Sequence, residues 1–253
     1  MSQLTIRPIA SLSSDRTEGL AGWCSLGSSA VILPNSTSLD PAVFVRCNTA
    51  VTTPPLVPEI RLCLATEITP IWQGTEEMLA HSGLPPPFWA FAWVGGQALA
   101  RYLLDHPAEI AGRSVLDFGA GSGLVAIAAA KAGAVSVLAA DIDRFATAAI
   151  AANAALNDVA VAATAVDLLD TVDPRWGVVT AGDVCYERPM ADRVTGWLRG
   201  LAGRGILVLL GDPGRTYLPS EGLVERARYI VPTSRELEDR DARDGVVWEV
   251  RPG

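Results

Sequence analysis

The sequence predicts an α/β fold whose centre is a doubly wound, largely parallel sheet. Two observations carry this prediction. Apolar strand-like runs alternate with helix-like patches across residues 113–253, and a glycine-rich turn joins the first of these strands to the first helix. Strands separated by helices form βαβ crossovers, which place helices on both faces of a parallel sheet. Hydrophobic residues make up 49% of the chain and charged residues 19%, so a sizeable core is available.

The segment before the sheet is irregular in its pattern. Residues 1–42 are rich in serine, threonine and glycine, so we expect a poorly ordered N-terminal extension. Phe44–Arg46 is predicted as a short strand or an extended entry into the domain. The prolines in Thr53–Pro58 prevent a regular helix there. Glu59–Ala65 is compatible with either a strand or a helix.

An aromatic block stands before the first regular helix. The proline-rich stretch Gly83–Pro87 is predicted as a stiff loop, and residues 88–93 then hold four aromatic side chains. Val94–Asp105 is predicted as a helix because its apolar residues recur at helical spacing. The helix is expected to end before Pro107, since proline disfavours helical backbone in the residue that precedes it.

The remaining elements alternate along the chain. Strands are predicted at Ser114–Phe118, Val135–Ala140, Val159–Val166, Gly177–Ala181 and Gly205–Leu210. Helices are predicted at Gly123–Gly133, Phe145–Asn157, Pro189–Leu201 and, as a short one, Glu221–Arg226. A final strand pair is expected from Ala227–Val231 and Val246–Val250.

The glycine-rich turn is the motif that carries chemistry. Gly119, Gly121 and Gly123 alternate directly after the first strand, and a helix begins behind them. Glycines let the backbone approach a ligand without a Cβ clash, and the helix N-terminus offers free N–H groups. Asp141 ends the next strand, where a carboxylate can accept both hydroxyls of a ribose. The sequence therefore predicts a nucleoside-binding site.

The spacing of the glycines narrows the choice among ligands that contain a nucleoside. A dinucleotide site usually reads GxGxxG, whereas this loop reads GxGxG with Asp117 before it. The loop also lacks the Lys-Ser/Thr pair of a P-loop, so ATP hydrolysis is not indicated. A ligand without a pyrophosphate suits the loop best, although a nicotinamide-dependent oxidoreductase stays an alternative.

The motif that runs from Asp117 through Gly119 and Gly121 to Gly123 resembles the first motif of class I S-adenosylmethionine-dependent methyltransferases. This resemblance implies a Rossmann-like sheet of about seven mostly parallel strands with an antiparallel last strand, behind an N-terminal extension. It divides the chain into the extension at 1–42, a family-specific segment at 43–112 and a cofactor-binding core at 113–253.

The resemblance also assigns cofactor contacts after the second and third strands. Asp141 matches the acidic residue that these enzymes place on the ribose, and Asp167 matches the acidic position near the adenine. Their neighbours Ile142 and Leu168 are assigned to the same site. Asp143 is expected to cap the following helix instead.

Two further features resemble the seven-strand lysine methyltransferases. They are the aromatic block and the Asp-x-x-Tyr motif, which is formed here by Asp183 and Tyr186. The resemblance implies that these two residues are catalytic, and it places Trp93, Gly95 and Gln97 near the methionine part of the cofactor. Elsewhere in the aromatic block, Trp89 and Phe91 are expected to pack in the core.

The resemblance is closest to the branch that methylates the β subunit of electron transfer flavoprotein, and it covers about residues 44–252. It implies an S-adenosylmethionine-dependent protein-lysine N-methyltransferase. The implied partner is a protein that bears an exposed lysine, with the flavoprotein β subunit or ribosomal protein L7/L12 as the first candidates. The alternatives are a small-molecule N- or O-methyltransferase and an inactive cofactor-binding module that regulates a partner.

Composition excludes several other classes. A net charge of −8 offers no phosphate-binding surface, and Asp183–Tyr186 stands where DNA amino-methylases carry Asn-Pro-Pro-Tyr, so no nucleic-acid partner is expected. Two histidines and four cysteines without a CxxC pair predict no metal site. The longest apolar stretch, Gly123–Ala140, is interrupted by Lys131, so no membrane span is expected.

Residue usage also suggests where the protein works. No signal peptide is recognised at the N-terminus, and scattered thiols suit a reducing compartment, so a cytoplasmic location is expected. Of the 20 basic residues only Lys131 is a lysine, and this arginine bias suggests a GC-rich, bacterial genome. The same bias leaves the enzyme almost no lysine of its own to methylate.

Overall fold

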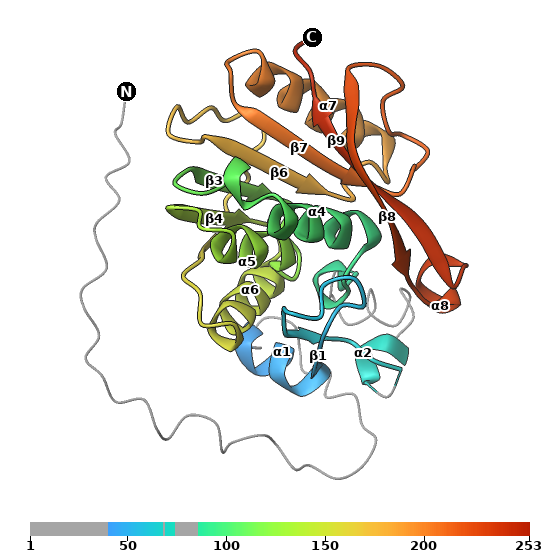
Figure 1. The fold of residues 1–253 in the computed structure, drawn as a ribbon. Coiled ribbons are helices and arrows are strands. Elements are labelled where there is room, and N and C mark those ends of the chain that lie inside the picture. Colours follow the sequence, from blue (N-terminus) through green and yellow to red (C-terminus); the bar gives the residue numbers. More distant parts are fainter. Residues whose placement is uncertain (1–39, 68, 74–85) are drawn as a thin grey trace, which may run out of the picture.

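A seven-stranded sheet forms the centre of the molecule in the computed structural model, which describes residues 40–67, 69–73 and 86–253 (Figure 1). The strand order is β5-β4-β3-β6-β7-β9-β8. The strands span Ser114–Phe118 (β3), Ser136–Ala140 (β4), Ala162–Thr164 (β5), Val178–Gly182 (β6), Leu207–Asp212 (β7), Leu223–Pro232 (β8) and Ala242–Val250 (β9). β3 to β7 pair in parallel, while β9 runs antiparallel to both β7 and β8. The predicted fold class, with its reversed last strand, is confirmed.

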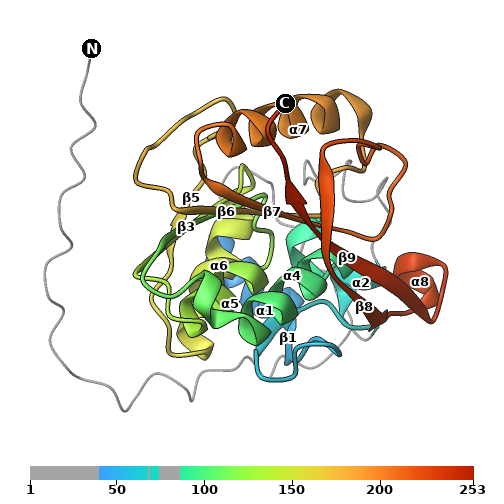
Figure 2. The ribbon, with the colours of Figure 1, turned by 45° about the horizontal axis from the view of Figure 1, so that its top comes forward.

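Helices cover both faces of this sheet. α4 (Val94–Asp105), α5 (Leu124–Lys131) and α6 (Arg144–Leu156) lie on one face, and α7 (Arg188–Ala202) lies on the other (Figure 2). Neighbouring residues of β3 show the two sides, because Val115 packs with α4 and α5 whereas Leu116 packs with α7. Strands that are buried on both faces explain why β3 and β6 read as continuous apolar runs.

The segment before the sheet begins with a helix. α1 spans Pro41–Asn48, and the carboxylate of Asp40 caps it by accepting a bond from the Ala42 N–H at 2.8 Å. The predicted strand or extended entry at Phe44–Arg46 is therefore wrong, because a capping residue and a proline in the first turn start a helix here. Most of the expected extension lies outside the described residues, and its expected boundary at residue 42 falls inside α1.

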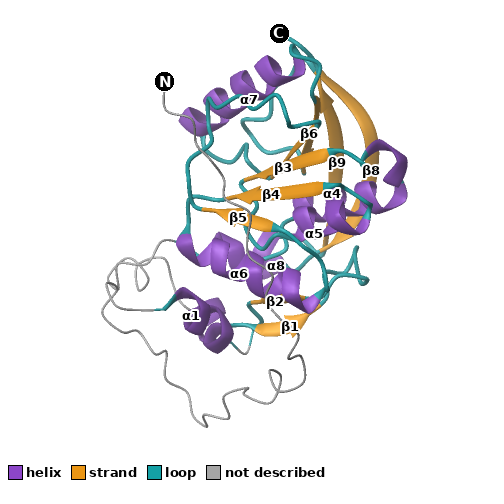
Figure 3. Ribbon diagram, turned by 90° about the vertical axis from the view of Figure 1, so that its left-hand side faces the viewer, coloured by secondary structure: helices purple, strands orange, loops and turns teal. Residues whose placement is uncertain are grey.

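A small hairpin follows α1 and is tied to the core by one asparagine. β1 (Ala50–Thr52) pairs antiparallel with β2 (Leu62–Leu64), which settles the open choice at Glu59–Ala65 in favour of a strand. The fully buried side chain of Asn153 accepts a bond from the Cys63 N–H at 2.7 Å and donates one to the Ser122 carbonyl at 2.8 Å. Asn153 thus joins the hairpin to the glycine-rich turn. Figure 3 shows α1 and the hairpin beside α6.

Short helices complete the chain. They are α2 (Pro70–Gln73), the 3₁₀ turns η1 (Phe88–Ala90) and η2 (Pro107–Glu109), and α8 (Arg235–Glu238). Most of the predicted loop Gly83–Pro87 lies outside the described residues. No helix in the described part of the chain combines the length and the apolarity needed to cross a membrane.

The long C-terminal hairpin corrects one prediction. Glu221–Arg226 is not a helix, because β8 starts at Leu223 and pairs with β9 along its length, apart from a bulge at Arg226. The expected final strand pair is confirmed, but β8 begins earlier than predicted because cross-strand pairing overrides local helical preference. The third predicted strand, Val159–Val166, is shorter than predicted, because only Ala162–Thr164 forms a strand.

The N-terminus of α4 lies directly on the ends of β6 and β7. A Cβ atom added at Gly95 would lie 2.2 Å from the Gly211 carbonyl oxygen, and one added at Gly182 would lie 3.1 Å from the Gly96 Cα. Backbone meets backbone at these contacts, so no side chain can move aside to make room.

This close approach predicts different outcomes for two adjacent substitutions. Gly95→Ala should lower the free energy of unfolding by roughly 3 kcal/mol, because its new methyl group meets the rigid backbone of β7. Gly96→Ala should change it by less than about 1 kcal/mol, since its Cβ would find only a Val125 methyl at 4.0 Å. Urea unfolding followed by circular dichroism measures both, and equal stabilities of the two variants would contradict the packing argument.

Candidate active site

A cleft of about 470 Å³ lies at the carboxyl ends of β3, β4 and β6. This is the edge of a parallel sheet where ligands bind in doubly wound folds. The predicted site residues that line it are Trp93, Gly119, Gly121, Asp141, Ile142, Asp167, Leu168, Asp183 and Tyr186. Four predicted residues, Gly95, Gln97, Asp117 and Gly123, do not line it. The volume falls in the range typical of small-molecule sites.

The glycine-rich turn forms one wall of the cleft. Gly119 and Gly121 adopt positive φ values of 65° and 50°, which glycine accepts without strain. The Asp141 carboxylate accepts a bond from the Gly121 N–H at 2.9 Å, so the end of β4 holds the turn in place. Gly123 also has a positive φ, of 79°, but it starts α5, where an added Cβ would lie 3.1 Å from Ile150. Gly123 therefore allows α5 to pack against α6, and its cofactor contact stays a prediction.

Acidic residues follow the second and third strands as predicted. The second carboxylate oxygen of Asp141 accepts the Asp143 N–H at 3.0 Å, and burial raises the pKa of Asp141. Asp143 caps α6 through the Phe145 N–H, as expected, whereas the ribose contact of Asp141 stays a prediction. Asp167 and Leu168 lie together on the cleft wall after β5.

Asp117 lies beneath the glycine turn rather than in the cleft. Only 1% of it is exposed, and its two carboxylate oxygens accept the Thr180 hydroxyl at 2.9 Å and the Ala126 N–H at 3.0 Å. The expected contact with the cofactor stays a prediction; in the structure the carboxylate joins β3 to β6 and to α5. Burial raises the pKa of Asp117 to about 7.

Gly95 and Gln97 also lie behind the cleft wall, and their nearness to the methionine part of the cofactor stays a prediction. Gly95 provides the close contact between α4 and β7 that a side chain would prevent. Gln97 is buried, donating to the Ala92 carbonyl at 2.7 Å and accepting the Leu56 N–H at 3.2 Å. It fastens the chain before α4 to the segment between β1 and β2. Both residues shape the site from behind.

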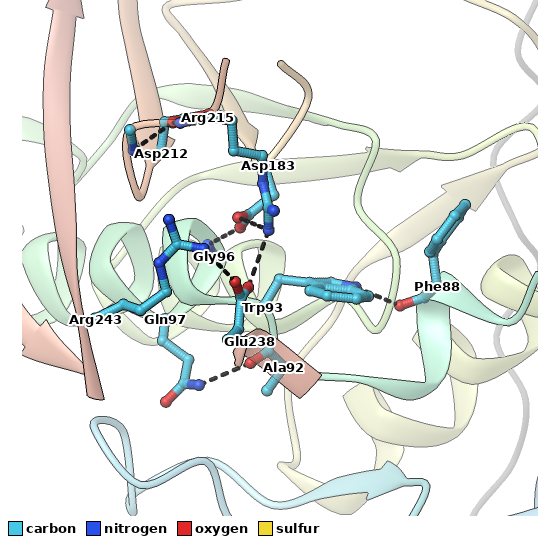
Figure 4. A network of polar contacts seen from close by, with 11 residues as sticks. Phe88, Ala92, Trp93, Gly96, Gln97, Asp183, Asp212, Arg215, Glu238 and Arg243 are labelled. Carbon is cyan, nitrogen blue, oxygen red and sulfur yellow. Dashed lines mark hydrogen bonds and ion pairs between the residues drawn. The ribbon is translucent and has the colours of Figure 1, made fainter. Parts of the chain in front are cut away.

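Asp183 stands at the end of β6 in a left-handed conformation with a φ of 56°. Its backbone N–H donates to the Gly211 carbonyl at 2.8 Å, and its carboxylate accepts the Gly96 N–H at 2.9 Å. The other carboxylate oxygen accepts the Arg215 guanidinium at 2.9 Å (Figure 4). Burial raises the pKa of Asp183 to about 6, Arg215 opposes this rise, and Asp212 adds to it.

Three aromatic rings, Phe88, Trp93 and Tyr186, form what we call the aromatic mouth of the cleft. The Phe88 ring lies 5.6 Å from the Tyr186 ring and 6.1 Å from the Trp93 ring, measured between centroids. The Trp93 indole N–H donates to the Phe88 carbonyl at 2.8 Å. Phe88 and Tyr186 are 47% and 45% exposed, so the mouth opens to solvent.

The other two aromatic residues of this block differ in burial. Trp89 is buried against Phe44 and Phe145, as expected for a core residue, although its edge reaches the cleft. Phe91 is only half-buried and packs at the margin of the same cluster.

Sequence reasoning missed Arg215, which lines the cleft beside Asp183. Its guanidinium carbon lies 5.7 Å from the centre of the Trp93 ring, within reach of a cation–π contact. A signal was present: Gly211–Arg215 spans the end of a strand at the same edge of the sheet, and it combines an acid, two glycines and a cation.

The reversed last strand, the glycine turn and the acid at the end of β4 define a class I S-adenosylmethionine-dependent methyltransferase. The family model described as ribosomal protein L11 methyltransferase (PrmA) matches residues 98–181. The chain is 37% identical over 229 residues to the electron transfer flavoprotein beta subunit lysine methyltransferase of Xenopus laevis, covering 88% of this chain and 92% of that protein. The chain belongs to the electron transfer flavoprotein beta subunit lysine methyltransferase family.

Two further relatives fit this assignment. The human protein of the same name is 37% identical over 223 residues, covering 85% of this chain and 84% of its own. A ribosomal protein L11 methyltransferase of Aliivibrio salmonicida is 39% identical over 95 residues, covering 37% of this chain and 32% of its own. The relatives that cover most of the chain come from animals, so they lend no support to a bacterial source.

The raised pKa of Asp117 predicts a pH dependence of stability. Between about pH 4 and pH 7 the native carboxyl keeps a proton that the unfolded chain has released, so the free energy of unfolding falls as pH rises through this window. Asp117→Asn removes this titration and should flatten the slope by up to about 1.4 kcal/mol per pH unit. Urea unfolding at pH 5, 6, 7 and 8 tests this, and parallel curves for wild type and variant would refute it.

Proposed function

We propose that this enzyme transfers a methyl group from S-adenosylmethionine to a lysine side chain of the β subunit of electron transfer flavoprotein. The observation that carries the proposal is the buried Asp183 carboxylate, which lies beside an aromatic mouth at one end of a nucleoside-sized cleft. The names of the relatives that match most of the chain supply the substrate. Ribosomal protein L7/L12 is the second protein to test.

The residues of the cleft fit the cofactor. Gly119 and Gly121 have no side chains where the turn lines the cleft, so a ligand can approach the backbone. Asp141 suits a ribose, and the wall around Leu168 suits an adenine. No cluster for a pyrophosphate accompanies these groups among the lining residues of the described chain. When bound, S-adenosylmethionine supplies an electrophilic methyl group on a positively charged sulfur. Carboxylates and aromatic rings are suitable neighbours for that charge.

The acceptor lysine must release one proton to solvent through the open mouth, and its free amine must be aligned with the methyl group, which it takes as S-adenosylhomocysteine leaves. A free lysine has a pKa near 10.4, so at neutral pH it enters as an ammonium ion. In the aromatic mouth, desolvation disfavours that charge, and the rings of Trp93 and Tyr186 guide the alkyl stem. Asp183 accepts a hydrogen bond from the nitrogen and orients it, because each of its carboxylate oxygens has one partner among the described residues and keeps a second lone pair.

We also propose a cytoplasmic location and, from the arginine bias, a bacterial source. The thiols of Cys63 and Cys185 are buried and form no disulfide, which suits a reducing compartment. Burial raises the pKa of Cys185 to about 12, so this thiol is protonated and inert although it stands inside the Asp-x-x-Tyr motif. Fractionation of the source cells checks the location.

Incubation with a labelled methyl donor tests the substrate. The purified full-length chain should transfer tritium from S-adenosylmethionine to recombinant flavoprotein β subunit, and mass spectrometry should locate the label on lysine. Lys131→Arg removes the enzyme's only lysine and serves as a control, since it should label the partner equally well. Label confined to small metabolites of an extract would overturn the proposal in favour of a small-molecule methyltransferase, and label in L7/L12 alone would redirect it.

Substitution of Asp183 tests its role. Asp183→Asn removes the negative charge but keeps the shape, so kcat should fall about 10- to 100-fold, the value of a charge-assisted hydrogen bond. The dissociation constant for S-adenosylhomocysteine, measured by calorimetry, should stay within about threefold. Asp158→Asn is the matched control, because Asp158 has a φ of 55°, is exposed and lies outside the cleft. Full activity of Asp183→Asn would exclude the assigned role.

Removal of the Tyr186 ring gives a separate test. Tyr186→Ala should raise KM for the protein substrate roughly tenfold, because the mouth loses one face that contacts the lysine stem. Tyr186→Phe keeps the ring and should retain most of the activity. Equal losses in the two variants would show that the hydroxyl, not the ring, is required.

A further inference from the structure

Asp183 belongs to a buried cluster of charged residues that extends away from the cleft (Figure 4). One guanidinium nitrogen of Arg215 lies 2.9 Å from Asp183 and 3.0 Å from Glu238. Arg243 donates to the other oxygen of Glu238 at 2.7 Å. The side chains of Asp183 and Glu238 are 8% and 3% exposed, so these contacts are shielded from water.

The members of this cluster come from separate segments of the chain. Asp183 directly follows β6, and the Asp212 carboxylate at the end of β7 accepts the Arg215 backbone N–H at 2.7 Å. Glu238 ends α8, and Arg243 lies in β9. The guanidinium of Arg215 is therefore fixed from behind by the C-terminal hairpin before it reaches Asp183.

The electrostatic balance of the cluster makes Arg215 important for the charge of Asp183. The carboxylates of Asp183 and Glu238 contact its guanidinium, and the charge of Asp212 also acts on it. One oxygen of Asp212 is buried without a hydrogen-bond partner in the described chain. A buried carboxyl beside a second carboxylate tends to keep its proton. Of the groups that act on the pKa of Asp183, Arg215 and the Gly96 N–H favour the ionised form, whereas burial and Asp212 oppose it.

We propose that Arg215 is a positioning residue for methyl transfer, which acts through Asp183 by keeping that carboxylate ionised and oriented, while Glu238 and Arg243 fix the guanidinium. This inference rests on the proposed role of Asp183 toward the lysine. Arginine suits the task because its planar fork can serve two carboxylates and keeps its charge when buried. Asp183 is left free to accept one further donor, which is the substrate nitrogen.

The pH profile of kcat/KM for the protein substrate tests the proposal. Arg215→Met should lower kcat/KM roughly tenfold or more at pH 7, because a neutral Asp183 no longer accepts the ammonium. The deficit should shrink as pH rises toward 9.5, where Asp183 ionises without help. Arg215→Lys keeps a charge at this position only while the buried amine stays protonated, so its loss at pH 7 should be smaller than that of Arg215→Met but should not vanish. Arg215→Gln is a second neutral variant if Arg215→Met does not fold.

Three controls keep the result specific. Binding of S-adenosylhomocysteine is measured by calorimetry in each variant, and kcat/KM is compared at saturating S-adenosylmethionine, so that a loss of cofactor affinity is not mistaken for the effect on Asp183. Arg175→Met removes an exposed arginine outside the cleft and should leave the profile unchanged. The double variant Asp183→Asn/Arg215→Met should be no worse than Asp183→Asn alone, because the two residues act in series.

Distinct outcomes separate the two proposals. A deficit of Arg215→Met that is equal at every pH, or losses that multiply in the double variant, would overturn the role of Arg215 while Asp183→Asn stays impaired. Wild-type activity of Asp183→Asn would instead overturn the role of Asp183, and the inference about Arg215 with it.

Discussion

The contact between the first turn of α4 and the ends of β6 and β7 is the constraint on which the site depends. Gly95 meets Gly211, and Gly96 meets Gly182, with backbone against backbone on both sides. This approach brings the Gly96 N–H to within 2.9 Å of the Asp183 carboxylate. It also fixes where the chain before α4 runs, and that chain carries Phe88 and Trp93 into the cleft. Packing of small residues thus positions chemistry contributed by three separate segments.

The carboxylates of the site are held in an environment that opposes their charge. Burial raises the pKa values of Asp117, Asp141, Asp183 and Asp212. Such groups destabilise the folded chain near neutral pH, because the unfolded chain ionises them freely. Both proposed ligands, a sulfonium and a lysine ammonium, are cations, so their binding offsets part of this penalty. Without a ligand, the ionised carboxylates of the site are unfavourable. A positively charged ligand stabilises them, so the site favours binding of cations.

Sequence reasoning succeeded where the signal is local and failed where it is not. The bounds of β3 and α4 were predictable because an apolar run and a helical period each lie within one segment. β8 was not, since its pairing with β9 overrides the helical look of residues 221–226. In the site, Asp117 and Gly123 belong to the recognised motif, yet they support the turn from beneath. A sequence motif does not distinguish a residue that contacts the ligand from one that shapes the loop. Arg215 was not predicted because its partners Asp183 and Glu238 lie 32 and 23 residues away in the sequence.

The chemistry of the proposed reaction explains why residue 215 is an arginine and not a lysine. A lysine at position 215 would place a second amine beside Asp183 and the Trp93 ring, in the same surroundings that are proposed to bind the substrate amine. Burial would lower its pKa and make it a competing methyl acceptor. A guanidinium remains charged in the same place and is a poor nucleophile. An enzyme that removes the proton from a lysine near a buried carboxylate therefore needs arginine, rather than lysine, to neutralise that carboxylate.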